Sequence, residues 1–337
     1  MAGIAKRIAR ELIFPLAAKI PSGLLSKIFS FPNGIVVMFH GVTKADYSWL
    51  NGRHMVEEDF EKMISYFKKN FTIQTTDQYF SNQPAKNGKP NMLLTFDDGF
   101  KNNLWSAKPI LEKYEAPAVV FMTSIGLEEQ DALLWADMVE VITYDQTSVN
   151  FNDDFFLKSR LGWQNSEGTH LHQVIKKLEP SKRDLALNQL GIDNNIIDRK
   201  HRIAREAWAL MDSNELKQLG NSGLIEVGSH SHQHYNLANI SLEMAKEEIV
   251  RSKDIIEATT GKSVLSIAFP DGSYNAAIKK ICREVGYKYL FAVNYNSNSH
   301  LDDKLDATIR SRFGISNTTT PESNILKMFR EAKSLAN

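Results

Sequence analysis

The chain has 337 residues, and its 40 lysine and arginine residues balance its 40 aspartate and glutamate residues. This length fits two average domains, but an α/β barrel of about 250 residues commonly folds as one unit, so we expect one core. The zero net charge removes the electrostatic argument for a nucleic-acid partner and suits a neutral ligand such as a sugar. Cys282 is the one cysteine of the sequence, so an intrachain disulfide is excluded.

Residues 1–31 form a basic and partly apolar segment that precedes the rest of the fold. Lys6, Arg7 and Arg10 lie before the short apolar stretch 12–18, which Pro15 interrupts. The stretch is shorter than the roughly 20 residues of a membrane-spanning helix, and no clean cleavage site for a signal peptide follows it. Two interpretations stay open: a helix that packs on the protein's own surface, or an amphipathic helix at a membrane interface. We expect a cytoplasmic protein, with peripheral contact at the inner membrane face as one option, and the sequence leaves export open.

Short apolar runs alternate with segments of helical period from residue 35 onward. Residues 35–39, 92–96 and 118–122 are typical of buried strands, and a helix is expected over residues 102–114. Phe60, Met63, Ile64 and Phe67 have the spacing of a helix face packed on a core.

The second half of the chain repeats the pattern. Residues 225–227, 265–269 and 287–293 resemble buried strands, and a helix begins after the N-cap Asn275 and ends before Gly286. Alternating strands and helices predict a parallel sheet, either a closed or partly closed barrel or a doubly wound sheet. Ligands of such sheets bind at the carboxyl ends of the strands.

The segment from about residue 137 to 214 departs from this alternation. It is polar, and we expect it to be mostly helical. It is interpreted as an insertion that covers one side of a site and selects substrates, or as two ordinary helices of the barrel wall.

Two polar clusters follow buried strands and predict a metal site. The sequence Thr95-Phe96-Asp97-Asp98-Gly99 ends one predicted strand. A second predicted strand is followed by three histidines, His230, His232 and His234. Adjacent buried carboxylates repel one another unless a cation or a proton neutralises one of them, and histidines with a carboxylate are the usual ligands of zinc. In an extended segment all three histidines would share one face, whereas in a turn His232 would point away from the other two.

These motifs resemble those of the polysaccharide deacetylases, also called the NodB-homology or carbohydrate esterase family four enzymes. Their first motif is TFDDG, and their second is H[ST]xxH followed by a leucine, here Leu237. The stretch from Ala268 to Gly272, with Pro270 and Asp271, resembles the third motif. The resemblance covers residues 35 to about 315. It implies a distorted, partly closed (β/α) barrel over residues 32–320 that carries the insertion, followed by a C-terminal helix over residues 321–337.

The resemblance also implies roles for individual residues. Asp97 would be the general base, and Asp98, His230 and His234 would hold the metal. Independently of the resemblance, repulsion from the adjacent Asp98 carboxylate is expected to raise the pKa of Asp97 modestly. The general-acid histidine of the usual carboxyl-terminal motif is missing. His40, after the first strand, resembles the permuted arrangement of the subgroup that deacetylates poly-N-acetylglucosamine.

A second departure is the missing cation of the third motif, which normally pairs with the base. Arg310 or Arg312 could supply that charge. We also predict supporting or substrate-binding roles for Pro270, Asp271 and Trp135.

The predicted function is metal-dependent removal of an N-acetyl group from an amino sugar in a polysaccharide or a lipid-linked precursor. Zinc is the first candidate metal, and cobalt, nickel and manganese accept the same ligands. The alternatives are a hydrolase of the same family that removes a formyl or O-acetyl group, and a catalytically silent glycan-binding protein.

Overall fold

The computed structural model describes residues 34–81, 88–159, 162–293, 306–315, 317 and 319–336. The predictions for residues 1–31 lie outside this range. Among the described residues, no helix is both long and apolar enough to cross a membrane.

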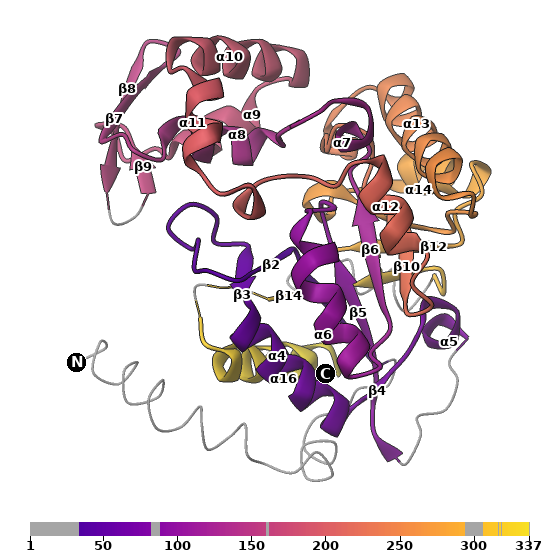
Figure 1. Cartoon of the computed structure of the whole chain (residues 1–337). Coiled ribbons are helices and arrows are strands. Elements are labelled where there is room, and N and C mark those ends of the chain that lie inside the picture. The colour runs from indigo at the N-terminus through magenta and orange to yellow at the C-terminus, as the bar shows by residue number, and fades with distance from the viewer. Residues whose placement is uncertain are drawn as a thin grey trace.

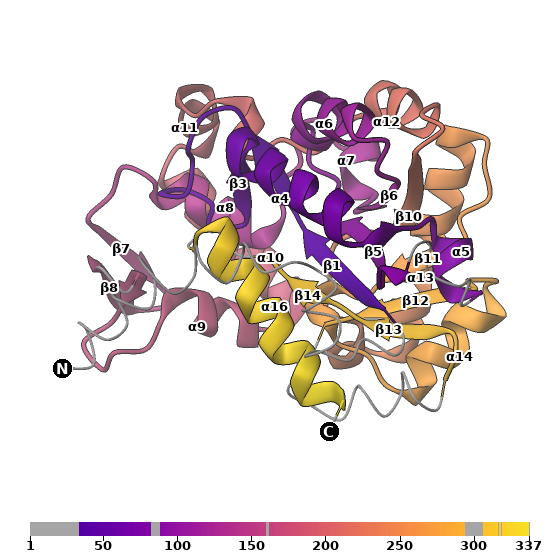
Figure 2. The same cartoon turned by 90° about the horizontal axis from the view of Figure 1, so that it is seen from below.

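Nine strands of the described chain form one parallel sheet in the order β13-β12-β11-β10-β6-β5-β1-β14, with β4 beside β5. Figure 1 labels β4, β5, β6, β10, β12 and β14, and Figure 2 labels β1, β11 and β13. They are β1 (Ile35–Phe39), β4 (Thr72–Ile73), β5 (Asn91–Phe96), β6 (Ala118–Met122), β10 (Ile225–Ser229), β11 (Ser266–Ala268), β12 (Tyr289–Ala292), β13 (Ile309–Ser311) and β14 (Phe313–Gly314).

The sheet curls into a nearly closed barrel, because its two edges meet in residues 309–314. The first half of this segment, β13, pairs with β12, and the second half, β14, pairs with β1. Arg312 is the residue between the two halves. The barrel expected from the resemblance is therefore confirmed, and the doubly wound alternative is excluded.

Helices cover the outside of the barrel (Figure 2). The helices of this layer are α4 (Glu57–Asn70), the π-helix η3 (Asn103–Ala107), α6 (Lys108–Lys113), α12 (Ser213–Gly220), α13 (Leu242–Thr260), α14 (Ala276–Glu284) and α16 (Pro321–Ala336). The short helix α5 (Thr76–Phe80) instead packs on the opposite face of the strands, with Tyr79 and Phe80 in the cluster of Leu93 and Phe291. The predicted face of α4 is confirmed, since Phe60, Met63, Ile64 and Phe67 are each fully buried. Burial of each such side chain contributes about 2 kcal/mol. Helix α14 begins as predicted, with Asn275 Oδ1 accepting a hydrogen bond of 3.0 Å from Ile278 N–H.

The insertion forms a separate lobe beside the barrel (Figure 1). The lobe has its own apolar cluster. Its elements are α8 (Trp135–Thr143), β7 (Ser148–Phe151), β8 (Asp154–Ser159), β9 (Gly162–Gln164), α9 (Leu171–Lys177), α10 (Pro180–Asp193) and α11 (Ile196–Arg202). Helices make up the larger part of its regular structure, and three antiparallel strands pair within residues 148–159 and 162–164. Asn152 and Asp153 both have positive φ, the geometry of a tight two-residue hairpin turn.

Shorter elements lie in the loops that connect the strands and helices of the barrel. A two-stranded parallel ladder joins β2 (Gly41–Thr43) to β3 (His54–Val56), and α7 (Ile125–Glu128) follows β6. Three 3₁₀ turns are η4 (Arg205–Ala207), η5 (Leu237–Asn239) and η6 (Pro270–Gly272).

Candidate metal centre

The two aspartates lie in a sharp turn at the carboxyl end of β5. Asp97 N–H donates to Phe39 O at 3.0 Å, which ties the turn to the end of β1. Asp98 then adopts φ 73°, a conformation that is unfavourable for a residue with a side chain. Gly99 follows with φ 78°, and a Cβ there would lie 2.5 Å from Met122 Sδ, so the turn requires glycine at that position.

The histidine segment after β10 is a turn, and the extended alternative is excluded. Ser231 and His234 have positive φ, and His234 N–H donates to Ser231 Oγ at 3.1 Å. His230 and His234 therefore face the same side, with ring centroids 4.9 Å apart. His232 points away, with Nδ1 2.9 Å from Ser124 Oγ and Nε2 3.5 Å from Glu128 Oε2.

Glu248 of α13 supports this turn from beneath. Its Oε2 accepts hydrogen bonds from the backbone N–H groups of His232 at 3.0 Å and Gln233 at 2.8 Å. The carboxylate is buried, so these bonds compensate for its lost hydration. Burial nevertheless raises the pKa of Glu248 above its ordinary value.

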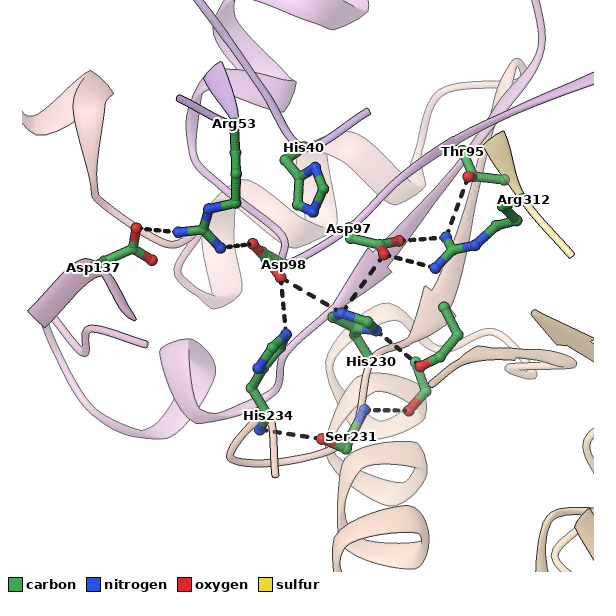
Figure 3. A network of polar contacts seen from close by, with 12 residues as sticks. His40, Arg53, Thr95, Asp97, Asp98, Asp137, His230, Ser231, His234 and Arg312 are labelled. Atoms are coloured by element: carbon green, nitrogen blue, oxygen red, sulfur yellow. Dashed lines mark hydrogen bonds and ion pairs between the residues drawn. The ribbon is translucent and has the colours of Figure 1, made fainter. Parts of the chain in front are cut away.

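Asp98, His230 and His234 bring three donor atoms together (Figure 3). Asp98 Oδ1 lies 3.5 Å from His230 Nε2 and 3.3 Å from His234 Nε2, and one donor atom from each of the three residues lies within 4.8 Å of the others. Tetrahedral ligands at about 2.0–2.1 Å from zinc are about 3.3–3.4 Å apart. The two short separations therefore agree with ligands of a common ion.

Hydrogen bonding also prepares these atoms for a cation. His230 Nδ1 lies 2.8 Å from Ala268 O, which can only accept, so the proton is on Nδ1 and Nε2 keeps its lone pair. Asp98 Oδ1 is buried and has no hydrogen-bond donor among the described residues. These residues fit a divalent metal.

Asp97 is held by Arg312 in a buried, two-pronged ion pair. Arg312 Nη1 lies 2.6 Å from Asp97 Oδ1, and Nη2 lies 2.7 Å from Oδ2. Arg312 is fully buried, and its Nη1 also approaches Thr95 Oγ1 at 3.3 Å. Arg310 does not reach the site, because its Nη1 donates to the backbone oxygens of Ile309 and Ala307.

This ion pair corrects the expected pKa of the general-base candidate. Burial alone would raise the pKa of Asp97, but the Arg312 guanidinium outweighs it and holds this pKa below its ordinary value. The neighbouring Asp98 behaves in the same way, since Arg53 and His234 outweigh burial and hold its pKa well below the usual range. Both carboxyl groups are therefore ionised at neutral pH. The predicted rise in the pKa of Asp97 is wrong.

His40 lies at the end of β1, beside the two aspartates (Figure 3). Its Nδ1 is buried without a hydrogen-bond partner in the described chain. Burial lowers the pKa of His40 to about 4, against the opposing effect of the Asp98 and Asp97 carboxylates. The imidazole is therefore neutral at pH 7, and its protonated form is a strong proton donor.

Sequence reasoning missed the residues that hold the other oxygen of Asp98. Arg53, before β3, donates from Nη1 to Asp98 Oδ2 at 2.7 Å, and its Nη2 pairs with Asp137. Asn51 Nδ2 donates to the same Asp137 carboxylate at 2.7 Å. Arg53 does not directly follow a predicted strand and belongs to no recognised motif. The only usable signal would have been its position in the segment that follows His40.

The remaining predicted residues surround this centre at different places. Pro270 is buried in the first position of η6, and Asp271 pairs with Lys176 Nζ at 2.7 Å across to the insertion. Asp271 also contributes to a raised pKa of His234, although the Asp98 contact is the stronger of these two effects and burial opposes both. Trp135 begins α8 and lines a cavity that does not include the three metal-ligand candidates.

Comparison with known proteins adds three findings. The sequence profile of the family described as "Polysaccharide deacetylase" matches residues 85–149 and 192–290, and the gap between the two segments falls within the insertion. The protein YxkH of Bacillus subtilis, whose name also assigns it to polysaccharide deacetylases, is 26% identical over 109 residues. That match spans 32% of this chain and 37% of YxkH.

Solved structures share the fold over most of the chain. The deacetylase PplD of Streptococcus pyogenes, determined in complex with acetate, aligns with a TM-score of 0.52 at 17% identity, covering 88% of this chain and 97% of PplD. IcaB of Ammonifex degensii aligns with a TM-score of 0.53 at 15% identity, covering 89% of this chain and 97% of IcaB. At such identities the likeness establishes the barrel architecture.

Proposed function

We propose that this chain, which belongs to the polysaccharide deacetylase family, is a metal-dependent hydrolase that removes an N-acetyl group from an amino sugar in a polysaccharide or a lipid-linked glycan. One observation carries the proposal. The donor atoms of Asp98, His230 and His234 converge directly beside Asp97, which is ionised and held in place by Arg312.

Asp98, His230 and His234 would hold the metal. A divalent ion bound there, with zinc as the first candidate and cobalt, nickel or manganese as acceptable substitutes, would supply Lewis acidity toward the acetyl carbonyl and lower the pKa of a bound water.

Asp97 would accept the proton of the attacking water. Its two oxygens each keep a free lone pair after pairing with Arg312, so the guanidinium orients the carboxylate without blocking it. The low pKa of Asp97 weakens it as a base and ensures that it stays unprotonated. The ion pair with Arg312 therefore fixes the orientation of the Asp97 carboxylate and lowers its basicity.

His40 would transfer to the departing amine nitrogen the proton that Asp97 takes from the attacking water. Because burial lowers its pKa to about 4, His40 holds this proton only briefly during the cycle, and transfer to an amine of higher pKa is favourable. Its unpartnered Nδ1 leaves the imidazole without a fixed tautomer before substrate binds.

The test is release of acetate from a panel of acetylated oligosaccharides and lipid-linked sugars, with and without a chelator and added metals. We expect metal-dependent release that falls at least 100-fold in Asp97→Asn and in His40→Ala. His201→Ala, a change at an exposed histidine of α11, is the matched control and should retain activity. Release of formate would indicate that the enzyme removes a formyl group. Release of acetate only from esters would indicate that it removes an O-acetyl group. Sugar binding without any release would indicate a catalytically silent protein.

We further propose a cytoplasmic location with peripheral contact at the inner membrane face. The basic residues Lys6, Arg7 and Arg10 beside an apolar stretch support this assignment. Fractionation of cells that produce the full chain, compared with a chain that begins after residue 31, would test it. Recovery of the full chain on the outer side of the inner membrane would contradict the cytoplasmic location.

A further inference from the structure

A cavity of about 430 Å³ lies between the insertion and the barrel. Trp135, Arg183 and Leu187 line it from the insertion, and Gln233 and Tyr235 line it from the loop that carries His234. This volume is within the range of small-ligand sites.

Arg183 is the unusual side chain of this cavity. It is only 5% exposed, and its guanidinium carbon lies 5.4 Å from the ring centre of Trp135 and 5.3 Å from that of Tyr235. Its buried Nε makes no hydrogen bond and lies at ion-pair distance, 3.5 Å, from Asp184 Oδ1. A buried donor without a hydrogen bond costs about 1–3 kcal/mol. A guanidinium whose one carboxylate partner is this distant suits a ligand rich in acceptor oxygens.

The charges around the cavity favour a neutral ligand over an anion. Lys200 and Arg183 are opposed by Glu129, Asp131 and Asp184 among the lining residues. The Tyr235 hydroxyl contacts Asp184 Oδ2 and lies 2.8 Å from Gln233 Oε1, and it can donate its one hydrogen to only one of these oxygens. The cavity therefore combines aromatic faces, amide groups and a guanidinium fork without an excess of positive charge. Neutral sugar rings present apolar faces together with hydroxyl and acetamido oxygens that match these groups.

We infer that this cavity is a second sugar-binding subsite, which holds an N-acetylated sugar of the glycan at a distance from the reacting unit. The inference rests on the proposed function for the identity of the ligand. Gln233 and Tyr235 flank His234 in the sequence, so one loop separates the cavity from the metal centre. The proposal requires that a longer oligosaccharide bound at the centre extends to Arg183 and that a dimer does not.

The experiment compares the dimer and the pentamer of N-acetylglucosamine as substrates for the full chain with metal added. In Arg183→Gln we expect kcat/KM for the pentamer to fall about tenfold, the value of one lost charge-assisted hydrogen bond of about 1.4 kcal/mol, with the dimer unchanged. Leu185→Ala, at a 73% exposed residue of the same helix, is the control and should change neither. Equal losses on both substrates, or no loss on the pentamer, would overturn the subsite.

Binding separates this inference from the proposed function. Calorimetry with Asp97→Asn measures pentamer binding when no acetate is released, and adding Arg183→Gln should weaken that binding about tenfold. The conservative variant Arg183→Lys keeps the charge and loses the fork, so it should lose affinity while its thermal unfolding stays close to that of the parent. If the pentamer does not bind, or if it binds Asp97→Asn equally well with and without Arg183→Gln, the subsite is refuted, whatever the acetate assay gives.

Discussion

The replacement Arg312→Met tests what the buried ion pair does for the base candidate. Asp97 and Arg312 are 3% and 0% exposed, and their two contacts are 2.6 and 2.7 Å long. Removing one partner of such a pair leaves an uncompensated buried charge, which costs about 3–5 kcal/mol. The carboxyl group can avoid most of this cost by binding a proton. Since about 1.4 kcal/mol corresponds to one pKa unit, we expect the pKa of Asp97 to rise by at least about 2 units.

The assay is the pH dependence of kcat/KM on an acetylated oligosaccharide. The acidic limb of the profile should move to higher pH in Arg312→Met, because the base is protonated over a wider range. Arg310→Met is the matched control. It removes a buried arginine two residues away that contacts backbone oxygens and not Asp97, so the limb should stay in place.

Unfolding measurements give a second readout that does not need turnover. A carboxyl group whose folded-state pKa is raised destabilises the fold as pH rises above its unfolded pKa. Arg312→Met should therefore lose more stability at pH 7 than at pH 4, relative to the wild type. If both the acidic limb and this pH trend are unchanged, Arg312 does not control the ionisation of Asp97.

Further predictions concern other buried groups. Asp98→Ala should abolish zinc binding measured by calorimetry, and Arg53→Gln should weaken it about 10–100-fold by releasing the second carboxylate oxygen; equal affinities would refute the role of Arg53. Burial lowers the pKa of His54 to about 3, so its contribution to stability is complete above pH 6.5 and is lost as pH falls, by about 2 kcal/mol at pH 5. His54→Phe should flatten this loss in urea titrations. Burial raises the pKa of Cys282 to about 12, so a thiol reagent at pH 8 should label it only after denaturation.

The sequence predicted those parts of the fold and site that depend on local order. Apolar runs located β1, β5 and β6, and the polar residues directly after β5 and β10 had to emerge at one end of a parallel barrel. The hairpin from Ser148 to Ser159 was missed because its composition is polar. Its alternation around Asn152-Asp153 was the available signal.

Contacts between distant loops could not be predicted in this way. Arg310 and Arg312 are equivalent in spacing and composition, and only the strand geometry decides which one reaches Asp97. Arg53 reaches Asp98 through a loop whose path no periodicity describes. The orientation of His232 depends on positive φ at Ser231 and His234, which non-glycine residues rarely adopt and which sequence patterns therefore do not indicate.

Closure of the barrel and orientation of the base candidate depend on the same residue. The strand segment 309–314 changes its pairing partner from β12 to β1 at Arg312, so the arginine has a neighbour on each side. Its Nε approaches Ala292 O at the end of β12 at 3.4 Å, and its Nη1 approaches Thr95 Oγ1 in β5. The guanidinium thus links strands from both sides of the closure before it reaches Asp97. This position places a guanidinium charge on Asp97, whereas the stretch from Ala268 to Gly272 contains no cation.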